Sequence, residues 1–504
     1  MPTLMEGTRK SSSEVDVEPV GGLLTGATPR QPLAYHEEQM AQKEEKMIVR
    51  KIDLNILPIL TVLFLFSFLD RTSIGNARIA GLGTELKLEG LKFSTAVSLF
   101  YVSYCVVEIF ANVAMRFTSA RWLLAGTMLG WGFITLITGF VVESYADLLV
   151  TRFFLGLSEG FFVPCAHFFI LVWYPHDYWM TRIAVFWVAP TVAGAFGGLI
   201  ARGCASIQDP NRSSWRYIYI IEGAVTLLVA IGAMFLLPDT LRKARFLKES
   251  ERDYWGQRLE ESRGSRQETD SKHHVLQAFL DWKVWLFGAS SVALIACVTA
   301  LAVFLPTIIA NLGYTNNTAQ FLTVPVYAAA CISTLFFGWL ARKTKVHGPY
   351  VLFCLALGII ATGCLQRFKT TGVQFGLTFM LAIGMFPTPS LTLTWLAASL
   401  HPSTKRGVGL GINIACANTG GVMASFLFLP KDAPNLYEKG HFALMICCLV
   451  SFMIALLFVC YFRLNSLRRP LLEEDLIRYA ALTPLERAQE DLKGDRAMNF
   501  RYTL

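Results

Sequence analysis

Apolar residues fall into blocks along the chain, and short polar stretches separate the blocks. Most blocks approach the roughly 20 residues that a helix needs to cross the hydrocarbon core of a bilayer. Because no water satisfies backbone groups in that core, blocks of this length predict α-helices. The predicted spans of the first half are Ile56–Ala77, Thr95–Ala114, Trp122–Val142, Leu148–Phe169, Arg182–Ile200 and Tyr217–Leu237. Those of the second half are Val284–Ile309, Ala319–Leu340, Tyr350–Gln366, Val373–Leu396, Gly407–Leu429 and His441–Phe462.

The spacing of these spans divides the chain into five parts. Two six-helix bundles are predicted at 54–237 and 284–462, and a charged loop at 238–283 joins them. Residues 1–53 are polar and rich in Ser, Gly, Pro and Glu, which is typical of a disordered tail, and residues 463–504 form a second tail. The expected fold is an all-α membrane protein with twelve transmembrane helices in two six-helix pseudo-repeats.

Lys and Arg residues in short loops predict orientation, because they concentrate on the cytoplasmic side of a membrane. On one side, together with both termini and the central loop, lie Lys43, Lys46, Arg50, Lys51, Arg116, Arg121, Arg342, Lys343, Lys345, Lys405, Arg406, Arg463, Arg468 and Arg469. The opposite side carries fewer, namely Lys87, Lys92, Arg367 and Lys369. Both tails and the central loop are therefore expected in the cytoplasm, with the protein in the plasma membrane. Leu241–Leu259 of the loop is predicted as an amphipathic helix along the membrane surface.

Composition excludes several classes of function. Hydrophobic residues make up 54% of the 504 residues and charged residues 16%, against about a quarter charged in soluble proteins. The net charge of +8 is modest, and no basic stripe with interleaved aromatics suggests a nucleic-acid partner. The eleven cysteines form no CxxC pair or Cys/His cluster, so no metal is expected. Without a phosphate-binding loop or a large domain outside the membrane, the sequence predicts neither an enzyme nor a cofactor, and a monomer is expected.

Two pairs of glycines are spaced for close helix packing in lipid. Gly194 and Gly198 form one GxxxG pattern in span five, and Gly407 and Gly411 form another in span eleven. Such spacing lets two helix backbones approach closely. The pattern fits a static contact between helices, and it fits equally a surface along which the helices slide during a rocking motion.

Four ionisable residues lie within predicted spans one and four. Asp70 and Arg71 belong to span one, and Arg152 and Glu159 to span four. A charge at the bilayer centre costs about 3 kcal/mol or more, so such residues normally pair or line a watery cavity. Arg152 and Glu159 share a helix face but are separated by about 10 Å along the axis, so they cannot pair with each other. Crossed pairing between spans one and four is therefore predicted. A fixed network that only orders the helices is the alternative, but ionisable residues inside a membrane favour a functional role.

Other polar residues in the spans are weaker candidates. Glu108 lies in span two and Glu222 near the outer end of span six, and both are as compatible with a structural as with a functional role. His167 could join a proton path, and it could equally donate a hydrogen bond to a backbone carbonyl. Candidate ligands in the second half, where aromatic residues are also common in packing, are Tyr327, Trp395, Asn413 and Asn418.

A set of short motifs extends over nearly everything from Lys46 to the end of the chain. They are Phe68–Ala77, Arg152–Glu159, Trp173–Pro175, Ile221–Gly223, Leu237–Thr240, Lys243–Leu247, Phe304–Ile308, Gly313–Tyr314, Leu322–Pro325 and Asn499–Tyr502. Together they resemble the anion:cation symporter family of the major facilitator superfamily, and specifically its fungal allantoate-permease-like branch. The resemblance implies two halves related by an axis along the membrane normal, and proton-driven uptake of organic anions, vitamins or small nitrogenous acids.

The resemblance also implies roles for individual residues. Proton coupling is expected from Asp70 and Glu159, and substrate binding or a place in the charge network from Arg71 and Arg152. Residues expected to act in the cytoplasmic loops and gating are Arg116, Arg121, Arg342 and Lys343. The partners implied are a small-molecule substrate, expected to be an organic anion, a proton and the lipid bilayer.

Departures from the family pattern bear on the substrate. Span seven lacks the Asn and Tyr that are common there, and span four has Cys165 and His167 where the family favours Gly and an apolar residue. Fewer hydrogen-bonding groups in the cavity favour a more apolar acid than allantoate.

Two other functions remain open at this level. Exporters of the superfamily usually carry Gly-Pro-x-x-Gly-Gly in span five, whereas here Ala189-Pro190 precedes Gly197-Gly198 at a different spacing. The alternative is therefore proton-coupled export of a hydrophobic acid or secondary metabolite. A nutrient sensor without net flux is the third hypothesis, but the short tail after Arg463 argues against it.

Overall fold

The computed structural model describes residues 32–114, 118–207, 209–264, 271–401, 403–468 and 473–483, with single positions beyond these that include Asp495 and Tyr502. The chain divides into two units, residues 1–50 and 51–504. The described residues of the first unit, 32–50, are helical and form the beginning of α1. Helix formers such as Ala, Glu, Gln and Lys dominate this stretch, which the sequence alone assigns to a tail.

The predicted spans coincide with helices or with pairs of helices. In the first half these are α1 (Pro32–Ala77), α3 (Lys92–Ala114), α4 (Ala120–Val141), α5 (Tyr145–Glu159) with α6 (Phe162–Trp173), α7 (His176–Phe186) with α8 (Ala189–Ala205), and α9 (Ser214–Leu236). In the second half they are α12 (Trp282–Asn311), α13 (Asn316–Thr344), α14 (Gly348–Arg367), α15 (Thr371–Met385) with α16 (Thr388–Ala398), α17 (Ser403–Ala424) and α18 (Glu438–Arg468). Among the described residues, nine helical segments are long and apolar enough to cross a membrane. The remaining three predicted spans correspond to α3, to α7 with α8, and to α17, and the all-α membrane fold is confirmed.

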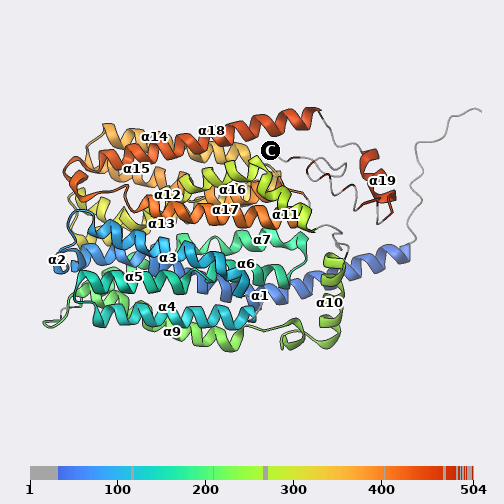
Figure 1. Cartoon of the computed structure of the whole chain (residues 1–504), viewed down its shortest axis with the longest axis horizontal. Helices are drawn as coiled ribbons and strands as arrows, with labels where there is room; N and C mark the ends of the chain where they lie inside the picture. Colours follow the sequence, from blue (N-terminus) through green and yellow to red (C-terminus); the bar gives the residue numbers. More distant parts are fainter. Residues whose placement is uncertain are drawn as a thin grey trace, which may run out of the picture. The chain divides into compact units, whose positions relative to one another are not determined.

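Figure 1 shows these helices running alongside one another, with α4 and α9 at one edge and α14 and α18 at the other. The end that carries α10 (Glu249–Gly264) and α11 (Ser271–Leu280) is called the α10 side here. The opposite end, with η1 (Arg78–Leu82) and α2 (Gly83–Glu85), is called the α2 side. The other short elements are η2 (Leu241–Lys243), η3 (Pro430–Asn435) and α19 (Glu473–Ala481).

The central loop differs from its prediction. A helix begins at Glu249 instead of Leu241, because the Glu251 carboxylate accepts a hydrogen bond from the Lys248 backbone N–H at 2.9 Å and so starts the helix there. Trp255 is fully buried, and its indole donates to the Trp173 carbonyl at 3.0 Å. This helix, α10, is therefore docked against the end of α6.

Three spans are interrupted midway, where α5 meets α6, α7 meets α8, and α15 meets α16. A proline lies three or four residues after the first residue of each break, and its ring would clash with the carbonyl of the residue four positions earlier. These prolines are Pro164, Pro190 and Pro389. At each break two residues form a turn between the helices, namely residues 160–161, 187–188 and 386–387, midway along the span.

The two halves pack closely on the α2 side. A side chain at Gly75 of α1 would overlap the Val303 carbonyl of α12. Gly194 and Gly198 of α8 lie directly against Tyr327 and against Gln320 and Thr323 of α13, so the predicted close approach is present there. Gly407 and Gly411 differ, since no described atom lies within 4 Å of a Cβ built on either, and Gly407 and Gly411 line an open space on the α10 side.

Candidate functional site

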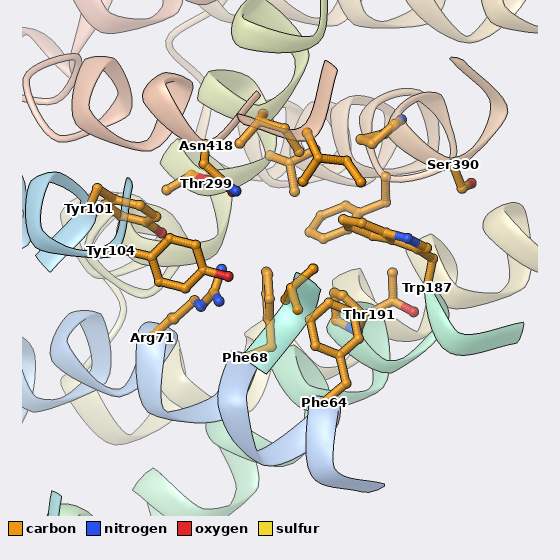
Figure 2. Close-up of a pocket in the computed structure, with 17 residues that line it drawn as sticks. Phe64, Phe68, Arg71, Tyr101, Tyr104, Trp187, Thr191, Thr299, Ser390 and Asn418 are labelled. Carbon is orange, nitrogen blue, oxygen red and sulfur yellow. The ribbon is translucent and has the colours of Figure 1, made fainter. Parts of the chain in front are cut away.

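A cavity lies between the two halves, among α1, α3, α12 and the breaks in the interrupted helices (Figure 2). It spans about 730 Å³ of space, part of it open to the surroundings. Its residues are Phe64, Phe68, Arg71, Tyr101, Tyr104, Val163, Trp187, Pro190, Thr191, Ile295, Val298, Thr299, Phe386, Pro389, Ser390, Ile414 and Asn418. Six of these are aromatic, and Arg71 is the cation among them. We call this space the central cavity.

A second space adjoins the central cavity on the α10 side. Val163 and Ile414 line both spaces, so the two are neighbours. Leu171, Trp179 and Arg406, which lie near the α10-side ends of α6, α7 and α17, line its outer part. We call it the vestibule. The central cavity is therefore closed by helix packing on the α2 side and adjoins open space on the α10 side.

Arg71 and Glu159 form an ion pair at the wall of the central cavity. Arg71 Nε donates to Glu159 Oε1 at 2.5 Å, and the Ser67 hydroxyl donates to the same oxygen at 2.6 Å. The guanidinium carbon also lies 4.6 Å from the centre of the Tyr104 ring. Arg71 Nη2 and Glu159 Oε2 have no hydrogen-bond partner among the described residues. Each group of the pair therefore keeps at least one polar atom, Arg71 Nη2 and Glu159 Oε2, free for a further hydrogen bond within the described part of the chain.

A second charged group lies behind this pair, inside the first half. Asp70 is fully buried beside Thr135 and Trp131 of α4, and it interacts electrostatically with Arg152 and with Glu159. Arg152 Nη2 donates to the Tyr219 hydroxyl of α9. The crossed pairing expected from the sequence is thus present for Arg71 and Glu159, while Arg152 has Tyr219 as its hydrogen-bond partner.

Glu222 of α9 completes this group, although the sequence alone places it near the outer end of its span. Ser73 donates to Glu222 Oε2, and Ser73 lies one turn after Asp70 on α1. Glu222 also interacts electrostatically with Asp70 and Arg152. The signal that could have found it is the buried face of α9, on which Tyr219, Glu222 and Thr226 follow at helical spacing.

We call Asp70, Arg71, Arg152, Glu159 and Glu222 the charge cluster. Asp70 and Glu159 are 0% exposed, Glu222 1% and Arg152 3%. Three carboxylates and two guanidiniums leave one negative charge uncompensated if all five residues are ionised. An uncompensated buried charge costs several kcal/mol, roughly 3–5 when a buried pair is broken, so the cluster is suited to holding one proton.

Comparison with known proteins identifies the family. The profile described as Major Facilitator Superfamily matches residues 60–425. The chain belongs to this superfamily. An uncharacterised transporter of Schizosaccharomyces pombe is 31% identical over 93% of this chain and 95% of its own length. The high-affinity nicotinic acid transporter of Saccharomyces cerevisiae is 29% identical over 79% of this chain and 74% of its own length.

A solved structure agrees with the fold. The xylose transporter XylE from E. coli, in a partially occluded inward open conformation, matches with a TM-score of 0.61 at 14% identity, over 81% of this chain and 99% of that chain. The chain is therefore a multi-pass membrane transporter of the major facilitator superfamily, and it is not an enzyme.

One hydrogen bond joins the two halves of the transporter where the central cavity meets the vestibule. Asn418 Nδ2 of α17 donates to Glu108 Oε2 of α3 at 2.7 Å. Asn418 lines the central cavity and Glu108 lines the vestibule. The Asn418 amide is thus occupied by the protein, and Glu108 ties one half to the other.

His167 lies in the wall of the vestibule. Its Nδ1 donates to the Val163 carbonyl at 2.8 Å, and its Nε2 accepts from the Trp187 indole at 3.4 Å. This arrangement corresponds to a neutral imidazole with both nitrogens used. Trp187, at the break between α7 and α8, lines the central cavity. The geometry gives His167 a role in orienting this tryptophan.

The candidates of the second half lie in different surroundings. Asn413 Oδ1 accepts from Ser291 at 3.2 Å, and Asn413 lines a small space beside the central cavity. Tyr327 packs between the halves against Gly194 and donates to the Ala302 carbonyl at 3.2 Å. Trp395 is 1% exposed and packs among Phe287, Phe458 and Phe462. Neither Tyr327 nor Trp395 lines the central cavity, because each ring fills a contact between helices.

The loop candidates lie at the α10 side. Arg121 Nε donates to the Met234 carbonyl of α9 at 2.9 Å, which ties the start of α4 to the end of α9. Arg342 is exposed, and Lys343 Nζ lies 5.0 Å from the centre of the Trp339 ring. Arg116 lies outside the described residues. The described side chains among them, those of Arg121, Arg342 and Lys343, do not line the central cavity.

Proposed function

We propose that this transporter couples the uptake of a small organic anion to protons by alternating access. The observation that carries the proposal is the ion pair between Arg71 and Glu159 at the wall of the central cavity, in which Arg71 Nη2 has no hydrogen-bond partner among the described residues. A guanidinium that faces a cavity with unused N–H groups is suited to gripping a carboxylate through a fork of two hydrogen bonds.

In the proposed cycle, protons and substrate compete for the same arginine. When Glu159 takes up a proton, its attraction for Arg71 falls and the guanidinium turns to the substrate carboxylate. When Glu159 loses the proton, it reclaims Arg71 and the anion is expelled. The two protonation states must bind substrate with different affinity, since equal affinity would shift no equilibrium.

The remaining members of the charge cluster supply a second place for the proton. Asp70 and Glu222 lie behind the cavity wall and share Arg152 as their nearby cation. With one acid more than arginines, a single proton makes the cluster electrically neutral. We propose that Asp70 and Glu159 carry the coupling proton and that Glu222 stabilises it.

We also propose the orientation of the protein in the membrane, the membrane in which it acts, its oligomeric state and its family branch. We assign the α10 side, where most Lys and Arg residues of the short loops lie, to the cytoplasm. On this assignment the vestibule opens inward. We place the protein in the plasma membrane, acting as a monomer, in the anion:cation symporter family and its allantoate-permease-like branch. The relative of Saccharomyces cerevisiae named for nicotinic acid, a carboxylic acid, supports an anionic substrate.

Transport in proteoliposomes tests the proposal. The transporter is reconstituted and offered labelled pyridine-3-carboxylate, benzoate, cyclohexanecarboxylate and allantoate under a pH gradient of either sign. Symport predicts accumulation when the outside is acidic, and a protonophore should abolish it. Accumulation only when the inside is acidic would instead indicate antiport and the alternative of export.

Two variants make the test specific. Asp70→Asn and Glu159→Gln imitate the protonated acids, so each should exchange substrate across the membrane without concentrating it. Accumulation that is independent of pH in the wild type, or undiminished in both variants, contradicts proton coupling by these residues.

A further inference from the structure

Most polar side chains in the central cavity already have partners. The Thr191 hydroxyl donates to the Val188 carbonyl at 2.8 Å, and the Ser390 hydroxyl donates to the Pro387 carbonyl at 2.9 Å. The Asn418 amide donates to Glu108. These groups offer few free donors to a ligand, so the cavity is not built for a substrate with many hydroxyl or amide groups.

Two buried polar groups that face the cavity lack partners, and they lie together. Arg71 Nη2 and the Tyr104 hydroxyl have no hydrogen-bond partner among the described residues, and the guanidinium stands over the Tyr104 ring. Figure 2 shows both side chains directed into the same end of the cavity. Within the described lining, Arg71 is the one cationic side chain. The cavity therefore offers a single anchor for a single negative charge.

Aromatic rings surround the remainder of the cavity. Phe64 is held by stacking on Phe186 at 4.3 Å with 5° between the rings, and the Trp187 ring meets Phe64 edge-on at 5.5 Å. Phe68 lies one turn before Arg71 on α1, and Phe386 contributes a ring from the second half. The labelled rings of the first half face this space (Figure 2), and Phe386 of the second half also lines it. Aromatic pairs gain energy from offset or edge-on contact beyond simple burial.

We infer that the substrate is a planar aromatic monocarboxylate. The inference rests on the proposed function and narrows it. The carboxylate binds to Arg71 Nη2 and the Tyr104 hydroxyl, and the ring lies among Phe64, Phe68 and Trp187 with Phe386 on the opposite side. A second carboxylate would be buried without a cation, which is unfavourable.

A ligand series on the full-length wild-type transporter in nanodiscs tests this at pH 7, where all the acids are ionised. Dissociation constants come from thermal-shift titrations. Benzoate and pyridine-3-carboxylate should bind roughly three- to tenfold more tightly than cyclohexanecarboxylate, which has the same charge but a puckered ring. Benzamide, which has the ring without the charge, and terephthalate, which has a second carboxylate, should both bind more than about tenfold more weakly than benzoate.

The outcomes separate the inference from the proposed function. Equal or tighter binding of cyclohexanecarboxylate overturns the aromatic specificity and leaves an organic anion as substrate. Tighter binding of terephthalate overturns the single-anchor argument. Failure of both aromatic acids to bind at millimolar concentration overturns the inference. Benzamide binding as well as benzoate would remove the need for an anion, and the proposed function would fail with it.

Substitutions in the cavity provide a second measurement. Phe68→Leu should weaken benzoate roughly three- to tenfold and leave cyclohexanecarboxylate within about twofold, because only the ring contact is lost. Tyr104→Phe should weaken both acids alike, because it removes a donor to the carboxylate. The matched control is Phe133→Leu on the exposed surface of α4, which should change neither. Equal loss for both acids in Phe68→Leu contradicts the proposed place of the ring, and if that variant does not fold, the wild-type series decides.

Discussion

The two halves of the transporter share a fold but differ in what they bury. The first half places Asp70, Arg152, Glu159 and Glu222 inside its helices, with Arg71 at the cavity wall. In the described part of the second half, buried Lys283 and Lys405 lie at the α10-side ends of α12 and α17, and the polar groups within the spans are mainly hydroxyls and amides. Two bundles with one architecture therefore carry different chemistry.

This difference suits the two halves to different roles in transport. Ionisable groups inside a membrane are costly and persist where they serve a function. In the proposed mechanism the first half supplies the anchor for the anion and the sites for the proton, whereas the second half supplies Phe386, Ser390 and the far wall of the cavity. Movement of the second half would open or close access without disturbing the charge cluster. Function thus depends on residues that the fold itself does not require.

The largest expected effect concerns the balance of charge in the cluster. Arg152→Gln leaves three acids with one arginine, so the folded state should lose about 3–5 kcal/mol, as when one partner of a buried pair is removed. Glu222→Gln leaves two acids with two arginines and keeps an acceptor for Ser73, so its cost should stay within about 1 kcal/mol. Unfolding in detergent, followed by tryptophan fluorescence, measures both. Glu222→Gln proving as destabilising as Arg152→Gln would contradict the charge count.

The next effect in size concerns the KM of transport, and it should distinguish Arg71 of the first half from Arg342 of the second. Arg71→Lys keeps the charge but loses the fork, so the KM for the transported anion should rise roughly ten- to hundredfold, equivalent to about 1.5–3 kcal/mol. Arg342→Lys, at the exposed end of α13, should leave KM unchanged. Both are measured as initial uptake rates, normalised to protein in the membrane. Wild-type KM in Arg71→Lys would assign that arginine a structural role.

Much of the fold could be predicted because apolar length is a local property of the sequence. The predicted span Tyr217–Leu237 agrees with α9 (Ser214–Leu236), and Tyr350–Gln366 agrees with α14 (Gly348–Arg367). Where a helix continues past its apolar stretch, as α18 (Glu438–Arg468) does beyond the predicted His441–Phe462, hydropathy alone predicts a helix that is too short.

The site was less accessible to prediction, because it depends on how each helix is turned about its axis. The cost of buried charge identified Asp70, Arg71, Arg152 and Glu159 as a group. It did not place Glu222 among them, because the sequence does not show which face of α9 packs against α1. Residue type alone could not show that Tyr327 and Trp395 fill helix contacts.

The smallest expected effect concerns charges at the edge of the second half. Lys405 Nζ lies 2.8 Å from Asp495 and 2.7 Å from Asp281, and Lys283 also pairs with Asp495. Lys283 Nζ donates to the Tyr502 hydroxyl at 2.9 Å, and the Tyr502 ring stacks on Phe462 at 4.6 Å. These contacts attach the C-terminal tail to the α10-side ends of α12, α17 and α18.

Asp495→Asn should loosen this attachment by about 1–2 kcal/mol, because Asp281 still neutralises part of the lysine charge. Limited proteolysis of the tail should then accelerate roughly 5- to 30-fold at pH 7, and the exposed Asp253→Asn on α10 serves as control. Burial alone would raise the pKa of Asp495, but Lys283 and Lys405 outweigh it and hold the pKa below its usual value. The stabilisation is therefore complete above the unfolded pKa of about 4 and is lost as pH falls through the lower folded value. Cleavage of the wild-type tail should consequently stay constant between about pH 8 and pH 5, and a rise within that range would show that another group holds the tail.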